Sequence, residues 1–329
     1  MAGPDLRDPA KWPQGYVPVS VDTLRHGSEV DFDLHIQRGG RMAHYRDSEV
    51  VFTEREAETR SANAIEVLWV REEGATGYGR YLEGQLDPMM ADAAVKTEAK
   101  VNALYASSKS VTLEILATPT RENMDWAEDV VQHTVGQVLG DPRSLAAMVA
   151  TLSTQYQLQS HSVNVSVYSV ALARQIGRTD DQELTEYGLG GLLHDLGKSL
   201  IDASTLNKPA RLTADEWKIM TGHPQDGYNL LGDFADRRTI TGQAVMDHHE
   251  RMNGTGYPRG LPGAQIPLAG RAVSIADNFD ALTTKRVDKD AIRAFDALVI
   301  MRDDMEGHFD RDILRESINP CREGRLSIN

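Results

Sequence analysis

Side chains that could bind metal ions gather in the second half of this 329-residue chain. Five of the ten histidines stand here with two aspartates, in or beside apolar segments: His161, His194, Asp195, His223, His248, His249 and Asp277. A mixed imidazole and carboxylate set suits Fe, Mn, Zn or Ni better than Mg or Ca, which prefer oxygen ligands. We therefore predict a metal centre built from these side chains.

The number of candidate ligands favours a catalytic centre over a structural one. If Asp195 bridges two six-coordinate ions, the seven side chains still leave positions open for water and substrate. Lys198 follows Asp195 by three residues and so lies on the same side of a helix or tight turn. We predict Asp195 and Lys198 as catalytic residues of phosphate ester cleavage; the alternative for Lys198 is a structural pair with a carboxylate.

Helices must position most of these side chains. His248 and His249 point about 100° apart on a helix, so both reach one ion only near a helix end, and Asn253-Gly254 follows within a turn. Asp277 lies among alanine, valine and isoleucine, where an ionised carboxylate is costly unless it is paired or ligating.

The pattern predicts an α+β N-terminal domain over residues 1–86, a helical linker over 87–140 and an all-α domain over 141–329. In the first, strands are expected at 31–36, 42–46 and 65–70, with a capping box at 53–56. Linker helices are expected at 89–116 and 124–139; they either transmit signals or dimerise, or simply pack on their neighbours. Further helices are expected at 144–156, 163–176, 183–193, 213–223, 266–284 and 291–305, and a loop at 253–263.

Composition narrows the possible partners and location. The net charge of −14 opposes binding to a nucleic acid polymer, although a nucleotide can still enter a locally basic pocket. No apolar run is long enough for a membrane span. The N-terminus does not resemble a signal peptide, and the single cysteine, Cys321, excludes an internal disulfide, so we expect a cytoplasmic protein.

Three motifs together resemble the HD-GYP domain, and the likeness runs from about residue 157 to 310. They are His194-Asp195 with Gly197-Lys198, then His248-His249-Glu250, then Gly254-Thr255-Gly256-Tyr257-Pro258. The resemblance implies an HD-type helical bundle that hydrolyses or binds the bacterial second messenger cyclic di-GMP. It also implies two or three metal ions, often iron or manganese.

Carried over residue by residue, the resemblance gives His161, His194, Asp195 and Asp277 to one metal ion. It gives His223, His248 and His249 to the second, with Asp195 shared. Lys198 would lie beside the scissile phosphate, and Tyr257, Arg271 and Arg286 would line the dinucleotide pocket; Tyr257 either contacts the ligand or only pins its loop. Some members have a glutamate one turn before the first histidine that brings in a third ion. Here this position is Gln157, so we expect two ions.

The expected reaction is hydrolysis of cyclic di-GMP to pGpG, with a further cut to GMP left open, by a hydroxide held between the two ions. The first alternative is a cyclic di-GMP receptor with weak or no turnover, because 287–289 departs from the family pattern. The second is a different phosphoester substrate, such as another cyclic dinucleotide. The N-terminal domain is expected to regulate the protein or to bind a partner, and a homodimer is one form this could take.

Overall fold

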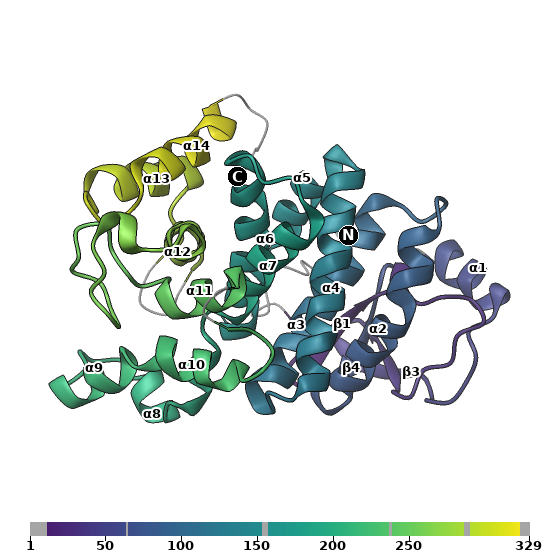
Figure 1. Ribbon diagram of the computed structural model, residues 1–329. Helices are drawn as coiled ribbons and strands as arrows, with labels where there is room; N and C mark the ends of the chain where they lie inside the picture. Colours follow the sequence, from purple (N-terminus) through teal and green to yellow (C-terminus); the bar gives the residue numbers. More distant parts are fainter. Residues whose placement is uncertain (1–11, 64, 153–156, 237–238, 286–289, 323–329) are drawn as a thin grey trace.

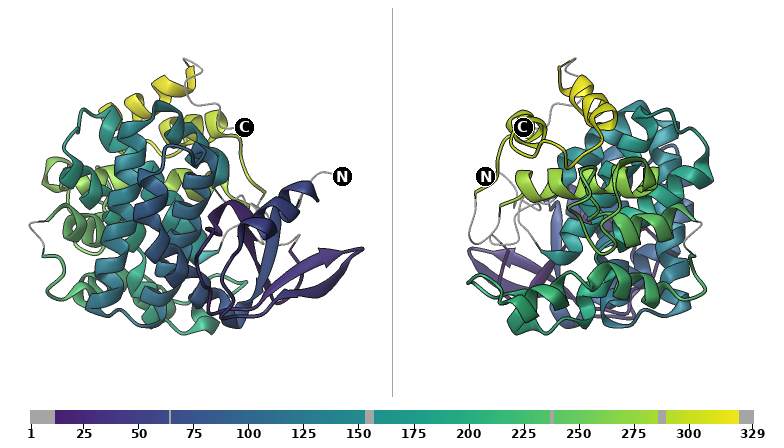
Figure 2. Two further views of the ribbon diagram at one scale, coloured as in Figure 1. Left: turned by 90° about the vertical axis from the view of Figure 1, so that its right-hand side faces the viewer. Right: turned by 60° about the vertical axis from the view of Figure 1, so that its left-hand side comes forward.

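The computed structural model describes residues 12–63, 65–152, 157–236, 239–285 and 290–322. A four-stranded antiparallel sheet lies to one side of a helical body (Figures 1 and 2). Its strands are β1 (Tyr16–Ser20), β2 (Leu34–Arg38), β3 (Arg41–Arg46) and β4 (Val67–Arg71), in the spatial order β1-β4-β2-β3. The α-helices of the first half of the chain are α1 (Glu54–Ala62), α2 (Ala75–Ala91), α3 (Thr97–Ala117), α4 (Arg121–Gly140) and α5 (Pro142–Thr151).

The second half is helical in the described part of the chain, as the sequence predicts. Its elements are α6 (Leu158–Gln175), α7 (Asp181–Leu193), the short 3₁₀ helix η4 (Leu196–Leu200), α8 (Ala203–Leu206), α9 (Ala214–Met220), α10 (His223–Leu231), α11 (Ile240–Asp247), a second 3₁₀ helix η5 (Gly263–Gln265), α12 (Leu268–Thr283), α13 (Ala294–Asp303) and α14 (Arg311–Arg322). Within the described residues, no helix is both long and apolar enough to cross a membrane.

Most predicted elements are present, with differences at their ends. The single helix expected at 89–116 is wrong, because α2 ends at Ala91 and α3 begins at Thr97. β2, β3 and β4 confirm the three expected strands, and β1, which pairs with β4, was not predicted. Both ends of the predicted capping box are formed, because Thr53 N donates to Glu56 Oε2 and Glu56 N donates to Thr53 Oγ1. The expected helix at 144–156 ends earlier, at Thr151, and 153–156 lie outside the described residues.

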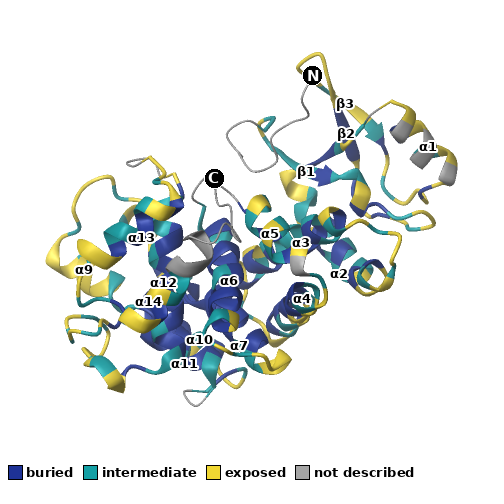
Figure 3. Ribbon diagram, turned by 90° about the horizontal axis from the view of Figure 1, so that it is seen from above, coloured by how far each residue is buried: buried dark blue, intermediate teal, exposed yellow. Residues whose placement is uncertain are grey.

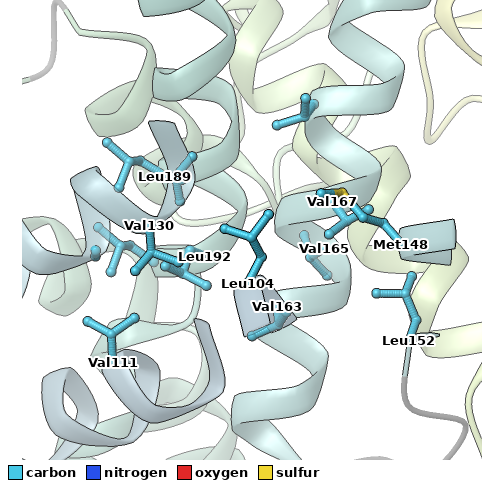
Figure 4. Packing of buried hydrophobic residues seen from close by; sticks show 14 of the residues in the cluster. Leu104, Val111, Val130, Met148, Leu152, Val163, Val165, Val167, Leu189 and Leu192 are labelled. Carbon is cyan, nitrogen blue, oxygen red and sulfur yellow. The ribbon is translucent and has the colours of Figure 1, made fainter. Parts of the chain in front are cut away.

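The helices between the sheet and the second half belong to one continuous core. Leu104 and Val111 of α3 and Val130 of α4 pack with side chains of α6 and α7 (Figure 4). Figure 3 shows that the buried faces of these helices turn toward one another. This packing favours the second of the two alternatives for residues 87–140, in which the helices simply pack on their neighbours.

Glycines bring α7 unusually close to three other helices. A Cβ on Gly191 would lie 2.8 Å from the Ser166 Cα of α6, and one on Gly188 would lie 2.5 Å from a Val131 methyl of α4. A Cβ on Gly190 would lie 2.5 Å from the Ala244 Cβ of α11. The apolar Gly-rich run that precedes His194 is therefore the central helix of the body, and it carries the histidine into the interior.

Candidate metal centre

The seven predicted ligands come from five helices and meet in the interior. His161 lies on α6, His194 directly follows α7 and Asp195 follows it, His223 begins α10, His248 and His249 follow α11, and Asp277 lies in the middle of α12. Six of these side chains are buried, and His249 is partly buried. The two adjacent histidines stand at a helix end, as their spacing requires.

Gly197 allows the turn after Asp195 to touch the start of α10. A Cβ at this position would lie 2.0 Å from the His223 carbonyl oxygen and 2.5 Å from the Gly227 nitrogen. No side chain fits there. The glycine between Asp195 and Lys198 therefore sets the distance between the carboxylate and His223.

The two carboxylate oxygens of Asp195 face two different groups of histidines. Oδ1 lies 3.2 Å from His223 Nε2 and 3.8 Å from His248 Nε2. Oδ2 lies 3.2 Å from His194 Nε2 and 3.7 Å from His161 Nε2. One ligand atom from each of Asp195, His223, His248 and His249 lies within 4.8 Å of the others, and the same holds for His161, His194 and Asp195. Asp195 is thus placed between two potential ion sites.

Asp277 completes the group around His161. Its Oδ1 lies 3.2 Å from His161 Nε2 and 3.9 Å from His194 Nε2. Each ion site accordingly has at least one carboxylate and two imidazoles within reach, which is the mixed donor set of a transition metal.

Four of the histidines have one ring nitrogen fixed by an acceptor, so that the other faces the centre. Nδ1 of His194 lies 2.8 Å from the Gly191 carbonyl, Nδ1 of His223 lies 2.7 Å from the Met220 carbonyl, and Nδ1 of His248 lies 3.0 Å from the Val245 carbonyl. A carbonyl can only accept, so each Nδ1 donates, and in a neutral ring Nε2 then carries the lone pair. This is the state in which imidazole binds a metal.

His161 is oriented by a carboxylate, which the sequence analysis did not identify. Its Nδ1 lies 2.6 Å from Asp280 Oδ2, while Asp280 Oδ1 accepts hydrogen bonds from Asn164 and Thr284. A carboxylate behind a ligating histidine fixes its tautomer and raises its basicity. The available signal was the three-residue spacing of Asp277 and Asp280 on an apolar helix, which places both on one face.

The donor atoms fit metal ions better than they fit one another. Among the described residues, His194 Nε2 and Asp195 Oδ1 are buried without a hydrogen-bond partner, although other polar atoms lie within 3.2 Å. Buried polar atoms are rarely left unsatisfied, since each costs free energy. Lone pairs that converge without a hydrogen bond, as at these two atoms, can point at a shared third atom, which is what a ligand set requires.

The surroundings keep both carboxylates ionised. Burial raises the pKa of Asp195, but His194 and Lys198 outweigh it and hold that pKa well below the usual range. Burial also raises the pKa of Asp277, and the hydrogen bond and charge of His161 together lower it far below an ordinary aspartate.

The same interior keeps His248 and His249 neutral. Loss of solvent lowers the pKa of His248 well below its ordinary value, and the neighbouring His249 lowers it further. Burial lowers the pKa of His249 to about 3. Neutral imidazoles and ionised carboxylates are the protonation states that ligate metals.

Lys198 and Tyr257 lie beside the cluster. The Lys198 ammonium is 2.6 Å from Asp195 Oδ2 and its side chain is 16% exposed, so it reaches from the centre toward solvent. The Tyr257 ring lies 4.6 Å from the His249 ring and 6.1 Å from Trp217, which is 54% exposed. Trp217 was not identified from the sequence as a site residue.

The loop that carries Tyr257 is fixed by Glu250. The two carboxylate oxygens of this buried residue accept the backbone N–H groups of Arg259 and Leu261, at 2.7 and 2.8 Å. A Cβ on Gly256 would lie 2.5 Å from the His249 carbonyl oxygen, so the loop passes directly over the histidine pair. Glu250 therefore orients the loop that faces the ligands.

The remaining expected residues stand elsewhere. Arg271 pairs with Asp310 at 2.6 Å, and no contact found in the described residues joins it to the cluster. It precedes Asp277 by six residues, about 240° around the helix, so its substrate role stays a prediction. Arg286 lies outside the described residues. Gln157 precedes α6, and its backbone carbonyl accepts the His161 N–H.

The fold and the site define a helical domain whose buried histidines and aspartates form a candidate metal centre. The sequence model of the family described as HD domain matches residues 140–313, more than half of the chain. The chain therefore belongs to the HD domain family, and this match together with the relatives below confirms the resemblance to HD-GYP proteins.

Two curated relatives and one solved structure illustrate this relationship. Cyclic di-GMP phosphodiesterase PA4108 of Pseudomonas aeruginosa is 34% identical over 232 residues, which are 69% of this chain and 56% of the relative. 3'3'-cGAMP-specific phosphodiesterase 3 of Vibrio cholerae is 33% identical over 162 residues, 48% of this chain and 35% of the relative. The chain thus spans about half or less of the length of these relatives.

The structure of Bd1817, a HDG"Y"P protein from Bdellovibrio bacteriovorus, superposes with a TM-score of 0.67. It is 21% identical and the match covers 93% of this chain and 99% of that one, which shows a shared fold.

Proposed function

We propose that this chain is a metal-dependent phosphodiesterase that hydrolyses cyclic di-GMP to linear pGpG. The observation that carries the proposal is the position of Asp195, whose two oxygens each face a separate group of histidines. Two relatives, 34% and 43% identical over the matched residues, are named cyclic di-GMP phosphodiesterases, which supports this substrate.

The residues divide into two ligand sets that share one carboxylate. His161, His194, Asp195 and Asp277 would hold one ion, and His223, His248, His249 and Asp195 the other. Divalent ions at such a centre supply Lewis acidity and the means to generate a nucleophile from water at neutral pH. Iron or manganese suits the donor set, with zinc or nickel as further candidates.

The chain's own side chains bind and orient the phosphodiester. Hydrolysis adds one water to phosphorus and breaks the bond to the ribose 3′ oxygen, which takes a proton. The Lys198 ammonium, held 2.6 Å from Asp195, neutralises charge that develops on the non-bridging oxygens. Burial raises the pKa of Tyr257, so its phenol stays protonated and can donate to the dinucleotide.

A second substrate is supported by a specific observation. Three relatives from Vibrio cholerae, 33–39% identical over the matched residues, are named 3'3'-cGAMP-specific phosphodiesterases. The two dinucleotides share the phosphodiester ring and differ in one base, so selection between them depends on groups that contact the bases.

The test measures hydrolysis by the chain purified without oxygen. The metal content of the same sample is first determined by elemental analysis. Cyclic di-GMP and 3'3'-cGAMP are incubated side by side, and linear products and GMP are quantified by chromatography. We expect pGpG from the wild-type chain and at least a ~100-fold loss in Asp195→Asn, since one carboxylate serves both ion sites.

The matched control is Asp303→Asn, because Asp303 forms an exposed pair with Arg302. Binding of cyclic di-GMP without product, by a sample loaded with metal, would identify a receptor and exclude the phosphodiesterase. Faster cleavage of 3'3'-cGAMP would keep the reaction and change the substrate.

A further inference from the structure

A cavity of about 700 Å³ lies between the N-terminal sheet and the helices, outside the metal centre. Its walls come from the segment leading into β1, the middle of α3, the end of α5 and the start of α6. Figure 3 shows β1 beside α3 and α5, where these walls meet. Among its lining residues are Trp12, Tyr16, Glu72, Tyr105, Lys109 and Leu113.

Lys109 brings a positive charge into this cavity without a counter-ion among the described residues. Its ammonium lies 5.0 Å from the centre of the Trp12 ring. In the described parts of the chain it forms neither a hydrogen bond nor an ion pair, and the cavity's one described carboxylate, Glu72, does not pair with it. Burial lowers the pKa of Lys109 to about 8. An unpaired ammonium in such a place costs free energy unless something compensates it.

Trp12 adds a second unused donor to the same cavity. Its indole Nε1 is buried and has no acceptor among the described residues. An indole N–H usually finds a partner when it is buried. The cavity therefore contains a cation and an N–H donor, neither of which has an acceptor.

The other walls are aromatic and apolar. Tyr16, Tyr105 and Leu113 line the cavity, and Leu113 is 45% exposed although it is a large apolar side chain. Pockets for small molecules combine such surfaces with a few polar groups that fix orientation. Here the polar groups that lack partners are donors, so the complementary ligand carries acceptors and negative charge.

We propose that this cavity binds a small organic anion, a carboxylate or a phosphate attached to an aromatic or apolar body. Lys109 is the counter-ion of the anionic group, the Trp12 N–H donates to it, and the apolar body lies along Tyr105 and Leu113. Gln157 also lines the cavity, and it stands four residues before His161 at the start of α6. The ligand thus contacts the helix that carries a residue of the metal centre.

Calorimetric titration of the full-length, metal-loaded chain tests this site. The probes are naphthoate, naphthylphosphonate and the uncharged naphthylmethanol. We expect saturable binding of at least one anion with a Kd below about 1 mM, and binding of the alcohol about tenfold or more weaker. The preferred anion tells whether a carboxylate or a phosphate is recognised.

Variants locate the binding. Lys109→Met is expected to weaken the anion about tenfold or more and to leave the alcohol unchanged. Lys109→Gln serves the same purpose if the methionine variant does not fold, which circular dichroism shows. The matched control is Lys100→Met on the same helix, whose ammonium donates to the Met90 carbonyl instead of lining the cavity.

Three results would overturn the proposal. They are the absence of saturable binding by either anion, equal affinity for the alcohol, and anion binding that persists in both Lys109 variants. The last would place the anion elsewhere, including the metal centre, and none of the three bears on turnover of a cyclic dinucleotide.

Discussion

Each histidine with a fixed Nδ1 has its ring oriented for metal binding by the protein itself. Three of the acceptors are backbone carbonyls close in sequence to their histidines, so local helix geometry supplies them. The fourth is the Asp280 carboxylate, 119 positions away in sequence from His161. The ring of His161 therefore depends on tertiary packing more than the others do.

Replacing Asp280 with asparagine tests this dependence. Asp280→Asn puts an amide where a carboxylate accepts from His161, Asn164 and Thr284, so the ring loses its charged acceptor. We expect metal affinity to fall about 10- to 100-fold, measured by competition with a chromophoric chelator. Asp303→Asn at the surface is the control, and unchanged affinity in Asp280→Asn would contradict the role assigned to Asp280.

The lowered pKa of Lys109 predicts that the stability of the protein depends on pH. Its folded pKa of about 8 lies below the ordinary 10.5, so between these values the unfolded chain holds more protons than the folded one. Stability then rises with pH across this window, and the cost of the charge is fully present below it. We expect Lys109→Met to be more stable than wild type at neutral pH, with a difference that shrinks as the pH approaches 10.5. Urea unfolding at several pH values measures this; a constant difference would show that the charge carries no penalty.

Residue types and spacing were enough to select the seven side chains that meet in the interior. Their hydrogen-bond partners were not predictable, because Asp280 and the carbonyls behind the rings are chosen by packing between helices. The family resemblance predicts a substrate contact for Arg271; its guanidinium pairs with Asp310, and the contact stays a prediction.

At the scale of elements, close approach of backbones builds the centre. Gly197→Ala would drive a Cβ into the His223 carbonyl and separate η4 from α10. We expect a loss of more than about 2 kcal/mol in unfolding free energy and fewer bound ions per chain. Denaturant unfolding and elemental analysis provide the measurements.

Gly136→Ala is the matched control for that variant. Gly136 lies on α4, and a Cβ added there would meet nothing within 4 Å, so alanine should stabilise the helix by about 0.5–1 kcal/mol. Equal behaviour of the two variants would mean that the contact at Gly197 is easily relieved.

The loop over the histidines makes a separate prediction. Glu250→Gln replaces one carboxylate oxygen by an NH₂ group that cannot accept the loop's backbone N–H. We expect the KM for the dinucleotide to rise about tenfold while the bound metal per chain stays constant. Glu56→Gln, in the capping box far along the chain, should leave KM unchanged. A fall in metal content instead would assign Glu250 to the ligands.

Element prediction succeeded for several helices with a clear apolar period, but it missed most of α2, which contains Pro88, all of α14 and some short pieces. α6, α7 and α12 lie within a few residues of their expected ends. α10 was missed because Pro224 was interpreted as a stop, whereas proline is favoured in the first turn of a helix. β1 was missed because it pairs with β4, a strand far away in the sequence; Tyr16, for example, lies opposite Arg71.

At the scale of the whole molecule, the metal centre rests on helices that precede it. Side chains of α3 and α4 form one cluster with those of α6 and α7, so the matched HD region, 140–313, does not contain its whole core (Figure 4). Val130 and Leu104 are 0% and 2% exposed, and removing their helices would uncover the partners that they bury. Exposed apolar surface of that kind leads to aggregation or loss of packing.

Two truncations follow from this arrangement. The fragment 141–329 should lose cooperative thermal unfolding and bind no stoichiometric metal, because α6 and α7 would face water where α3 and α4 now lie. The fragment 75–329 is the matched comparison: it lacks the sheet but keeps α2 to α4, and we expect it to fold, with a lower Tm, and to bind metal. Calorimetry of both fragments measures Tm and cooperativity of unfolding, and elemental analysis measures the bound metal per chain. A folded 141–329 fragment with a full complement of ions would show that the centre is built by its own helices alone, and that α3 and α4 serve only to connect it to the sheet.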